Sequence, residues 1–390
     1  MKENFEKEWL ENNCPQTKVT FDTMYLVTTM DCNLACKYCV VLGNENYSTK
    51  RINTMEIETG IAALNLFKKQ LAKTQPENCR ITFYGGEPLL NQKLLFALIP
   101  KIREITYPNM SNPIEIVIIT NGYLYNPELT ELCKKHNVDI AISIDGKREH
   151  HDMTRVTSKT LQGTFDQVIK NLKKYQESGL NIGITTTIGQ HNYKSLPEIG
   201  EYFVKELGIK FIEFQLPCLV PNDNNPYWVS TEEFVQKLME TYDLLQSYDA
   251  IEGTTYRRIK DFARGKIRFT DCGAAGSQLV IAPDGMMGPC HSFVGSRTFF
   301  EGNVKDKNCD PSEMDNFIEW AKRIPLNMEI CIDCPFISLC GGGCIYNSYI
   351  ASGTIWNKDP QMCSYIKGMV DWILKDLWKK TGMSEKYGIS

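Results

Sequence analysis

A short stretch near the start of the chain carries three closely spaced cysteines. Cys32, Cys36 and Cys39 form a CxxxCxxC array in the run DCNLACKYC. Thiolates are soft ligands that hold iron and tolerate its change of redox state. A cubic four-iron cluster held by three cysteines keeps one iron free for another molecule. Structural zinc is the weaker interpretation, because it needs four ligands and no fourth is apparent nearby.

A second group of cysteines lies in the last third of the chain. GMMGPC ends at one of them, and CIDCPFISLCGGGC contains four more in a CxxCxxxxxCxxxC pattern. The group comprises Cys272, Cys290, Cys331, Cys334, Cys340, Cys344 and Cys363. Because CxxC spacing is also typical of zinc ribbons, two structural zinc sites are the alternative to iron. Five further cysteines stand alone, and a lone cysteine is interpreted as a small buried hydrophobe. They are Cys14, Cys79, Cys133, Cys218 and Cys309.

Composition restricts the partners and the compartment. The net charge is −4, from 43 basic and 47 acidic residues, so no general basic field attracts nucleic acid or an anionic membrane. No apolar run approaches the roughly 20 residues that span a bilayer, and MKENFEKEWLENN lacks the apolar core of a signal peptide. We expect a cytoplasmic protein, in which thiols stay reduced and clustered cysteines indicate metal.

A repeated pattern of short apolar runs predicts the elements that must position the cysteines. The runs MYLVTT, RITFY, IEIVIIT, VDIAISI, LNIGITTTI and IKFIEFQL alternate with amphipathic stretches at 55–73, 91–106, 127–136, 160–178 and 195–207. Such βα units indicate a parallel sheet, and six strands favour a partial (β/α)6 TIM-like barrel with its site at the carboxyl ends of the strands. A helix is expected at 230–248 and another at about 364–380.

Glycine, cysteine or short polar residues follow four of these strands. They are the cysteine loop, GGEP at 85–88, TNG at 120–122 and SIDG at 143–146. Each could be an ordinary tight turn. Because the carboxyl ends of parallel strands meet at one rim, we expect the four segments to form a single site there.

The cysteine array, followed by GGEP, TNG and SIDG in this order, resembles the signature of the radical S-adenosylmethionine (SAM) enzymes. The resemblance implies that the free iron binds SAM, whose cleavage yields a 5′-deoxyadenosyl radical that removes hydrogen from carbon. It also implies that Tyr38 places its ring near the adenine of SAM and that Leu216 lines the adenine site. Gly85, Gly86 and Glu87 are expected at the methionine amino group, Ser143 and Asp145 at the ribose, and Arg155 at the SAM carboxylate.

The second cysteine group resembles the SPASM domain, the auxiliary-cluster module of radical SAM enzymes that act on peptides and proteins. By order of occurrence, the resemblance assigns Cys272, Cys290 and Cys344 to a first auxiliary [4Fe-4S] cluster, and Cys331, Cys334, Cys340 and Cys363 to a second. An eighth cysteine of some relatives is replaced here within GAAGSQLV. The first auxiliary cluster is therefore expected to have an open or non-cysteine iron that could bind a substrate thiolate, unless Cys218 or Cys309 folds in as the missing ligand.

The domain boundaries follow from these assignments. We expect a lead-in at 1–23, the partial barrel at 24–229, a bridging helical segment at 230–265, the SPASM domain at 266–369, and a C-terminal helix and tail at 370–390. Only 23 residues precede the first strand, fewer than the roughly 80 of a leader-binding domain. A leader peptide would then be recognised by a separate protein or by another surface.

The residue after the GxxxxC cysteine separates the related subfamilies. Anaerobic sulfatase-maturing enzymes carry Asp there as a base, whereas this chain carries His291, and PCHSFVG resembles the maturases that install thioethers in ribosomally made peptides. We therefore expect a peptide crosslinking enzyme, most simply a thioether-forming one, with His291 as a candidate base and a flavodoxin- or ferredoxin-type reductant. Carbon–carbon or carbon–oxygen crosslinking, sulfatase maturation, a non-catalytic iron–sulfur electron carrier and a zinc-stabilised binding protein are the alternatives.

Overall fold

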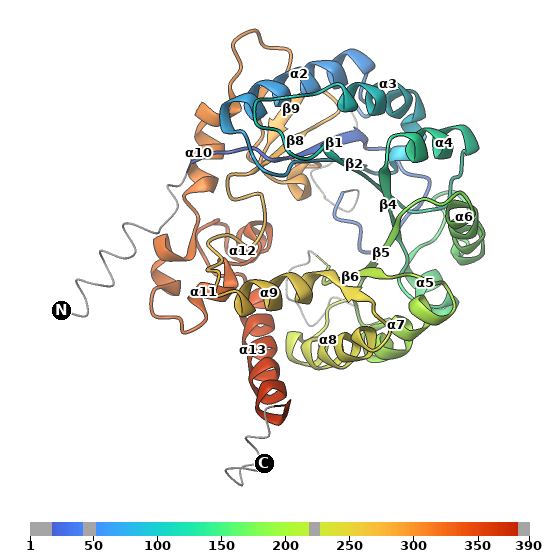
Figure 1. The fold of residues 1–390 in the computed structure, drawn as a ribbon, viewed down its shortest axis with the longest axis vertical. Coiled ribbons are helices and arrows are strands. Elements are labelled where there is room, and N and C mark those ends of the chain that lie inside the picture. The colour runs from blue at the N-terminus through green and yellow to red at the C-terminus, as the bar shows by residue number, and fades with distance from the viewer. Residues whose placement is uncertain (1–17, 42–51, 218–226, 381–390) are drawn as a thin grey trace, which may run out of the picture.

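A computed structural model of the chain describes residues 18–41, 52–217 and 227–380. Its centre is a curved parallel sheet, closed on its convex side by helices (Figure 1). The six central strands are β1 (Thr23–Thr29), β2 (Arg80–Gly85), β3 (Glu115–Thr120), β4 (Val138–Ser143), β5 (Ile182–Thr187) and β6 (Phe211–Gln215). The helices between them are α2 (Ile57–Thr74), η1 (Pro88–Asn91), α3 (Gln92–Arg103), α4 (Pro127–Lys135), α5 (Arg148–Thr154), α6 (Phe165–Glu177), η2 (Tyr193–Ser195) and α7 (Leu196–Lys205). The predicted partial barrel of parallel strands is therefore confirmed.

Alternating side chains explain why these strands form a barrel wall. In β3, Ile116 and Ile118 are fully buried against the outer helices, whereas Val117 and Ile119 face the cavity inside the barrel. Successive side chains of a strand point to opposite faces, so one strand supplies both the helix-facing core and the lumen. Helix α4 begins at a capped end: Asn126 accepts hydrogen bonds from two of its backbone N–H groups, and Pro127 lies in its first turn.

The chain after β6 extends the sheet at both edges. Its elements are α8 (Thr231–Gln246), β7 (Ile251–Glu252), α9 (Gly253–Ala263), β8 (Gln278–Ile281), β9 (Met286–Gly288), η3 (His291–Phe293), β10 (Glu301–Asn303), η4 (Pro311–Glu313), α10 (Asp315–Ala321), η5 (Pro325–Asn327), η6 (Glu329–Cys331), α11 (Ile337–Cys340), α12 (Ile345–Ser352) and α13 (Pro360–Lys380). The sheet order is β10-β9-β8-β1-β2-β3-β4-β5-β6-β7. The expected six-strand sheet is thus only its central part.

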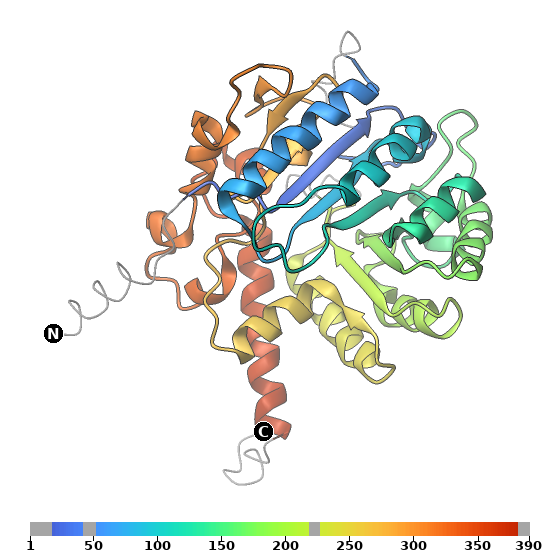
Figure 2. The same ribbon diagram turned by 45° about the horizontal axis from the view of Figure 1, so that its top comes forward.

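One edge joins the C-terminal part of the chain to the barrel. Strand β8 runs parallel to β1, with Thr23 opposite Gln278 and Leu26 opposite Ile281. The orange strands β8 and β9 lie beside the blue strand β1 (Figure 1), and in Figure 2 orange segments again flank the blue strand, whereas the red helix α13 runs away from it. A second apolar core lies behind this junction, where Phe293 makes edge contacts with Trp320 and Tyr346.

Candidate functional site

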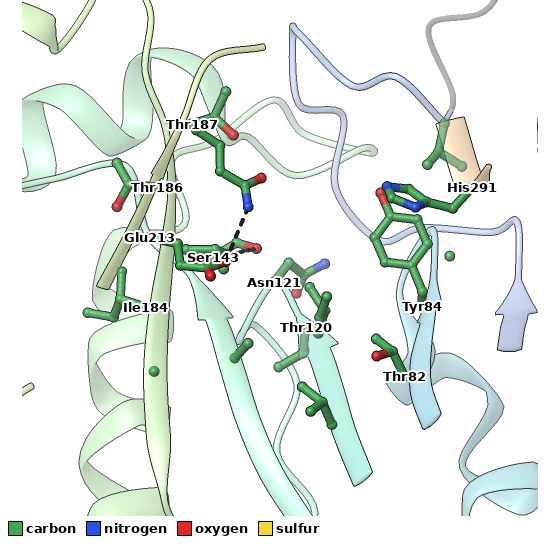
Figure 3. A pocket seen from close by; sticks show the side chains of 18 of the residues that line it. Thr82, Tyr84, Thr120, Asn121, Ser143, Ile184, Thr186, Thr187, Glu213 and His291 are labelled. Atoms are coloured by element: carbon green, nitrogen blue, oxygen red, sulfur yellow. Dashed lines mark hydrogen bonds between the residues drawn. The ribbon is translucent and has the colours of Figure 1, made fainter. Parts of the chain in front are cut away.

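A cavity of about 580 Å³ occupies the lumen of the barrel. Side chains of Thr82 and Tyr84 on β2, of Ser143 on β4 and of Glu213 on β6 surround it, with His291 on the β2 side (Figure 3). The predicted site residues that line it are Cys32, Cys36, Tyr38, Cys39, Gly85, Gly86, Ser143, Arg155, Leu216 and His291. The structure therefore brings the cysteine loop and three of the predicted rim segments to one cavity, together with a residue of the C-terminal part.

The cysteine loop is held by backbone contacts. Ala35 N–H donates to Val156 C=O at 2.8 Å and Lys37 N–H to Thr154 C=O at 3.1 Å, which fixes the loop to the segment after α5. Cys39 N–H donates to Cys36 C=O at 3.1 Å and closes the CxxC turn. The three thiols are thus held on one side of the lumen.

Two glycines of GGEP allow the loop to pack closely. A Cβ on Gly85 would lie 2.2 Å from Thr29 O, and one on Gly86 would lie 2.3 Å from Asp31 O. Gly85 also has φ +139, a conformation open mainly to glycine. Besides lining the cavity, the two glycines therefore leave room for the backbone of Thr29 and Asp31, which leads into the cysteine loop.

The surroundings of the thiols fit a metal cluster. Burial raises the pKa of Cys32 to about 11 and that of Cys36 to about 12, and the neighbouring thiols add to both shifts. Leu34 N–H lies 3.4 Å from Cys32 Sγ, Asn121 Nδ2 3.7 Å from it, and Arg155 Nη1 3.9 Å from Cys36 Sγ. Grouped, buried thiols need a cation to become thiolates, and the N–H donors aimed at sulfur are those that orient and tune a cluster.

Arg155 is oriented by a network behind the cysteine loop. Its Nε lies 3.1 Å from Oδ2 of Asp145, and its guanidinium carbon lies 5.5 Å from the centroid of the Tyr38 ring. The Tyr38 hydroxyl donates to Asp145, as do Thr154 Oγ1 at 3.0 Å and Thr187 N–H at 3.1 Å. Although burial alone would raise it, the pKa of Asp145 is held well below its usual value by Arg155. Asp145 is fully buried and does not line the cavity, so the structure places it behind Arg155.

Glu87 also lies behind the cavity wall. Its carboxylate accepts hydrogen bonds from Leu89 N–H at 2.9 Å, Thr120 Oγ1 at 2.8 Å and Asn121 N–H at 2.8 Å. Burial nevertheless raises its pKa to about 7. These contacts tie the GGEP segment to the TNG segment, and Asn121 Nδ2 in turn donates to Asn33 Oδ1 at 2.9 Å, inside the cysteine loop. The protein occupies much of the capacity of Glu87 to accept hydrogen bonds.

His291 lines the cavity on the side of β1 and β2. Its ring stacks on Tyr25 and meets the edge of Tyr84, with ring centroids 4.8 Å apart in both contacts. Burial lowers its pKa to about 4, so the imidazole is neutral at pH 7. Among the described residues, its buried Nδ1 has no hydrogen-bond partner. A neutral imidazole beside a cavity can accept a proton.

Several of the C-terminal cysteines lie near one another or near a shared neighbour. Cys290 immediately precedes His291, and both Cys272 and Cys290 raise the pKa of Tyr25, after the larger effect of burial. Burial and the neighbouring thiols Cys363 and Cys334 raise the pKa of Cys331. The pKa of Cys340 is likewise raised by burial, Asp271 and Cys363, while the Gly342 backbone N–H opposes the shift. Cys334 N–H donates to Cys331 C=O at 3.0 Å, a turn like that of the first CxxC segment.

The described cysteines do not converge tightly. Within the described ranges, no three His, Cys, Asp or Glu side chains form a group for a single metal ion. A four-iron cluster instead takes its cysteines at separate corners. Of the two cysteines considered as an extra ligand, Cys218 lies outside the described residues. Burial, with Asp306 and Asp310, raises the pKa of Cys309, and a backbone hydrogen bond from Asn303 opposes this shift.

The sequence interpretation missed several residues of the site. His191 lies 3.8 Å from Asp145 and stacks on Tyr38 at 6.2 Å; it follows strand β5, where the rule that polar residues after strands meet at one rim could have found it. Glu213 faces the lumen and pairs with Arg257 at 2.6 Å. Tyr25 and Tyr84 could not be identified as site residues from the sequence, because an aromatic residue in an apolar run has no distinctive signal.

Comparisons with known proteins agree with this geometry. Residues 26–203 match the model of the Radical SAM superfamily. The radical SAM cyclopropyl synthase TigE of Paramaledivibacter caminithermalis is 27% identical, over 94% of this chain and 76% of that protein. A cysteine-type anaerobic sulfatase-maturating enzyme of Clostridium novyi is 25% identical, over 81% of this chain and 86% of that protein.

Solved structures share the fold. Native anSMEcpe with bound AdoMet superposes with a TM-score of 0.76 at 20% identity, covering 92% of this chain and 98% of that one. Streptococcus suis SuiB bound to its precursor peptide SuiA superposes with a TM-score of 0.66 at 16% identity, covering 92% and 80%. No described helix of this chain is long and apolar enough to cross a membrane.

Proposed function

Because residues 26–203 form a radical SAM domain, we propose that this chain is a maturase that removes hydrogen from a ribosomally made peptide and closes a crosslink, in the first place a thioether from a peptide cysteine. One observation carries the proposal. The lumen has the loop of Cys32, Cys36 and Cys39 in one part of its wall and His291, the neighbour of Cys290, in another. A peptide side chain that enters this cavity would meet both in its wall.

The cofactors of this proposal are SAM and three [4Fe-4S] clusters. When bound, they supply the 5′-deoxyadenosyl radical and accept the surplus electron. Tyr38, Ser143, Arg155 and Leu216 line the cavity, where they would bind SAM. The proposed ligands are Cys32, Cys36 and Cys39 for the SAM-binding cluster; Cys272, Cys290 and Cys344 for the first auxiliary cluster; and Cys331, Cys334, Cys340 and Cys363 for the second.

The protein contributes orientation and proton transfer. Arg155, fixed by Asp145, would hold the SAM carboxylate through its free donors. His291 is neutral at pH 7 and would accept the proton of a peptide thiol; because its low pKa makes it a weak base, the thiol would have to be acidified by binding to an iron of the first auxiliary cluster. Val117, Ile119 and Tyr84 would border the radical with apolar and aromatic surface, in a wall that also carries polar and charged side chains.

Carbon–carbon crosslinking is the second candidate, and one comparison favours it. The relative with 94% coverage of this chain is a cyclopropyl synthase. Carbon–oxygen crosslinking would use the same framework. Sulfatase maturation is supported by the Clostridium novyi relative, but His291 replaces the aspartate expected of that group.

Anaerobic reconstitution tests the reaction class. The chain is loaded with iron and sulfide, reduced with dithionite and given SAM; 5′-deoxyadenosine is expected, whereas an electron carrier would form none. A colourless anaerobic preparation that contains zinc without acid-labile sulfide would exclude both iron interpretations. Peptides encoded beside the gene are then tested for a mass loss of about 2 Da, the two hydrogens released by one crosslink, and fragmentation locates the joined atoms.

The same proposal includes the cellular partners. We place the enzyme in the cytoplasm, with a flavodoxin- or ferredoxin-type reductant and, if the peptide has a leader, a separate leader-binding protein. Replacing dithionite by a flavodoxin system should maintain turnover. A sulfatase gene next to this one, and conversion of its peptide, would displace the crosslinking proposal.

A further inference from the structure

Arg323, just after α10, is a buried cation without a carboxylate partner. Its side chain is 1% exposed. Among the described residues it forms no ion pair, whereas the buried Arg258 and Arg297 pair with Asp271 and Asp284. Burial of a charge is costly unless hydrogen bonds or an opposite charge compensate it. The position of Arg323 therefore needs a physical reason.

Oxygen atoms of the cysteine-rich segment surround the guanidinium. Nη2 donates to Gly342 C=O at 3.0 Å, to Ser348 Oγ at 2.7 Å and to Asn357 C=O at 3.0 Å. Nη1 lies 3.4 Å from Gly343 C=O, and Nε donates to Ile355 C=O. Neutral acceptors satisfy the donors but leave the positive charge in place.

The loop that receives Arg323 joins the two proposed auxiliary cluster sites. Gly341, Gly342 and Gly343 connect Cys340, assigned to the second cluster, with Cys344, assigned to the first. All three glycines have positive φ, between +69 and +83, which disfavours any other residue. A Cβ on Gly342 would lie 3.3 Å from Nη1 of Arg323. The arginine therefore occupies the space beside this loop.

The acidic groups near Arg323 are mainly cysteines that are assigned to the clusters. Burial lowers the pKa of Arg323, and the groups that oppose this effect are Cys344, Asp359, Cys272 and Cys331. Cys344 and Cys272 belong to the first assigned set and Cys331 to the second. Asp359 is itself engaged, because its carboxylate accepts Cys344 N–H at 2.9 Å and Gln361 N–H at 2.9 Å.

We propose that Arg323 supplies a fixed positive charge at the junction of the two auxiliary clusters and raises the reduction potential of both. The inference rests on the auxiliary clusters of the proposed function. Each cluster with its thiolates is anionic and becomes more negative on reduction, so a nearby fixed cation stabilises the reduced state. Arg323 is a positioning and tuning residue for electron acceptance and does not contact the peptide.

The test separates charge from hydrogen bonding. Arg323→Gln removes the charge but keeps donors, and Arg323→Lys keeps the charge but loses the fork. The full-length chains are reconstituted anaerobically, and the auxiliary clusters are titrated potentiometrically by electron paramagnetic resonance; the SAM-binding cluster is recognised by its spectral change on SAM addition. We expect Arg323→Gln to lower the auxiliary potentials by at least a tenfold change in the reduced-to-oxidised ratio, which is about 59 mV for one electron. Arg323→Lys should leave the reduction potentials of the auxiliary clusters close to those of the unmodified chain.

Arg103 provides a matched control. Its guanidinium also donates to backbone carbonyls, those of His136 at 2.9 Å and Asn137 at 3.1 Å, but it lies on α3 of the barrel. Arg103→Gln should leave the auxiliary potentials unchanged. If Arg323→Gln does not load clusters, Arg323→Met is compared with Arg323→Lys in its place.

The outcomes are distinguishable by iron analysis. Equal potentials in the charged and neutral variants overturn the role of Arg323 while the proposed function stands. An unmodified chain that takes up only the iron of one cluster overturns the auxiliary clusters and the role of Arg323 together. Lowered potentials in the neutral variants alone support the proposal.

Discussion

The Nε atom of Arg155 lies 3.1 Å from the Oδ2 atom of Asp145, and both side chains are buried. Only Arg155 of the two lines the cavity. The carboxylate therefore fixes the direction of the guanidinium and would act on a ligand of the cavity only indirectly. Asp145 therefore has a positioning role toward Arg155, and its expected contact with the ribose of SAM stays a prediction.

Asp145→Asn should weaken SAM binding at least tenfold and reduce the free energy of unfolding by about 3–5 kcal/mol, because Arg155 keeps its charge in a buried position without a partner. Calorimetric titration with SAM and equilibrium denaturation measure the two effects. Asp139→Asn is the control: Asp139 also lines the cavity, but among the described residues it forms no ion pair, and it accepts a hydrogen bond from Asn181 Nδ2 at 2.7 Å. Unchanged SAM affinity in Asp145→Asn would mean that Arg155 needs no fixed orientation.

Gly86→Ala should prevent formation of the SAM site. The new methyl group would lie 2.3 Å from Asp31 O, so the cysteine loop must move away from β2. We expect at least a tenfold loss of SAM affinity and incomplete cluster loading, measured by calorimetry and iron content. Gly179→Ala is a matched control: it has φ +79 with open space around it, and should cost about 1–2 kcal/mol of stability with normal SAM binding. Equal SAM affinity in the two variants would contradict the steric argument.

His291 should make folding stability depend on pH in a defined window. Its pKa is lowered by burial from 6.5 to about 4, so the unfolded chain binds the extra proton between these values. Stability from this group is therefore full above about pH 6.5 and is lost as the pH falls toward 4. Subtracting the unfolding free energies of His291→Gln from those of the unmodified chain across pH 4–7 isolates the effect. A flat difference curve would show that the folded-state pKa is not lowered.

The same residue makes a kinetic prediction. As a base that stays neutral down to about pH 4, His291 should produce no acid limb near pH 6.5 in the kcat/KM profile for peptide crosslinking. His291→Ala should slow crosslinking by roughly 10²–10⁴-fold while SAM cleavage without peptide stays normal. Crosslinking at the unmodified rate would exclude His291 as an essential base.

Replacing Cys32, Cys36 and Cys39 together by Ala should remove one cluster selectively. We expect the loss of about four irons per chain, no 5′-deoxyadenosine, and an unchanged electron paramagnetic resonance spectrum from the auxiliary clusters. Iron analysis and product chromatography measure these outcomes. Loss of all iron would indicate that the cysteine groups assemble as one unit.

Sequence patterns were sufficient for features that depend on local order. Alternating apolar runs predicted β1 to β6, and the rule that parallel strands end at one rim predicted that the cysteine loop and Ser143 share a cavity. The pairing of β8 with β1 could not be predicted, because it joins segments far apart in the chain through backbone atoms that every residue possesses. The enclosure of Asp145 was likewise hidden, since it depends on how α5 returns Thr154 and Arg155 to the rim.

Strand β1 hydrogen-bonds to β2 on one side and to β8 on the other. The cysteine loop leaves the end of β1, and Cys290 follows β9, which pairs with β8. The cysteine loop and Cys290 are therefore attached to neighbouring strands of one continuous hydrogen-bonded sheet. A change in the distance between them would require sheet hydrogen bonds to break, so the sheet keeps this distance constant, and a substrate that contacts both would have to match it.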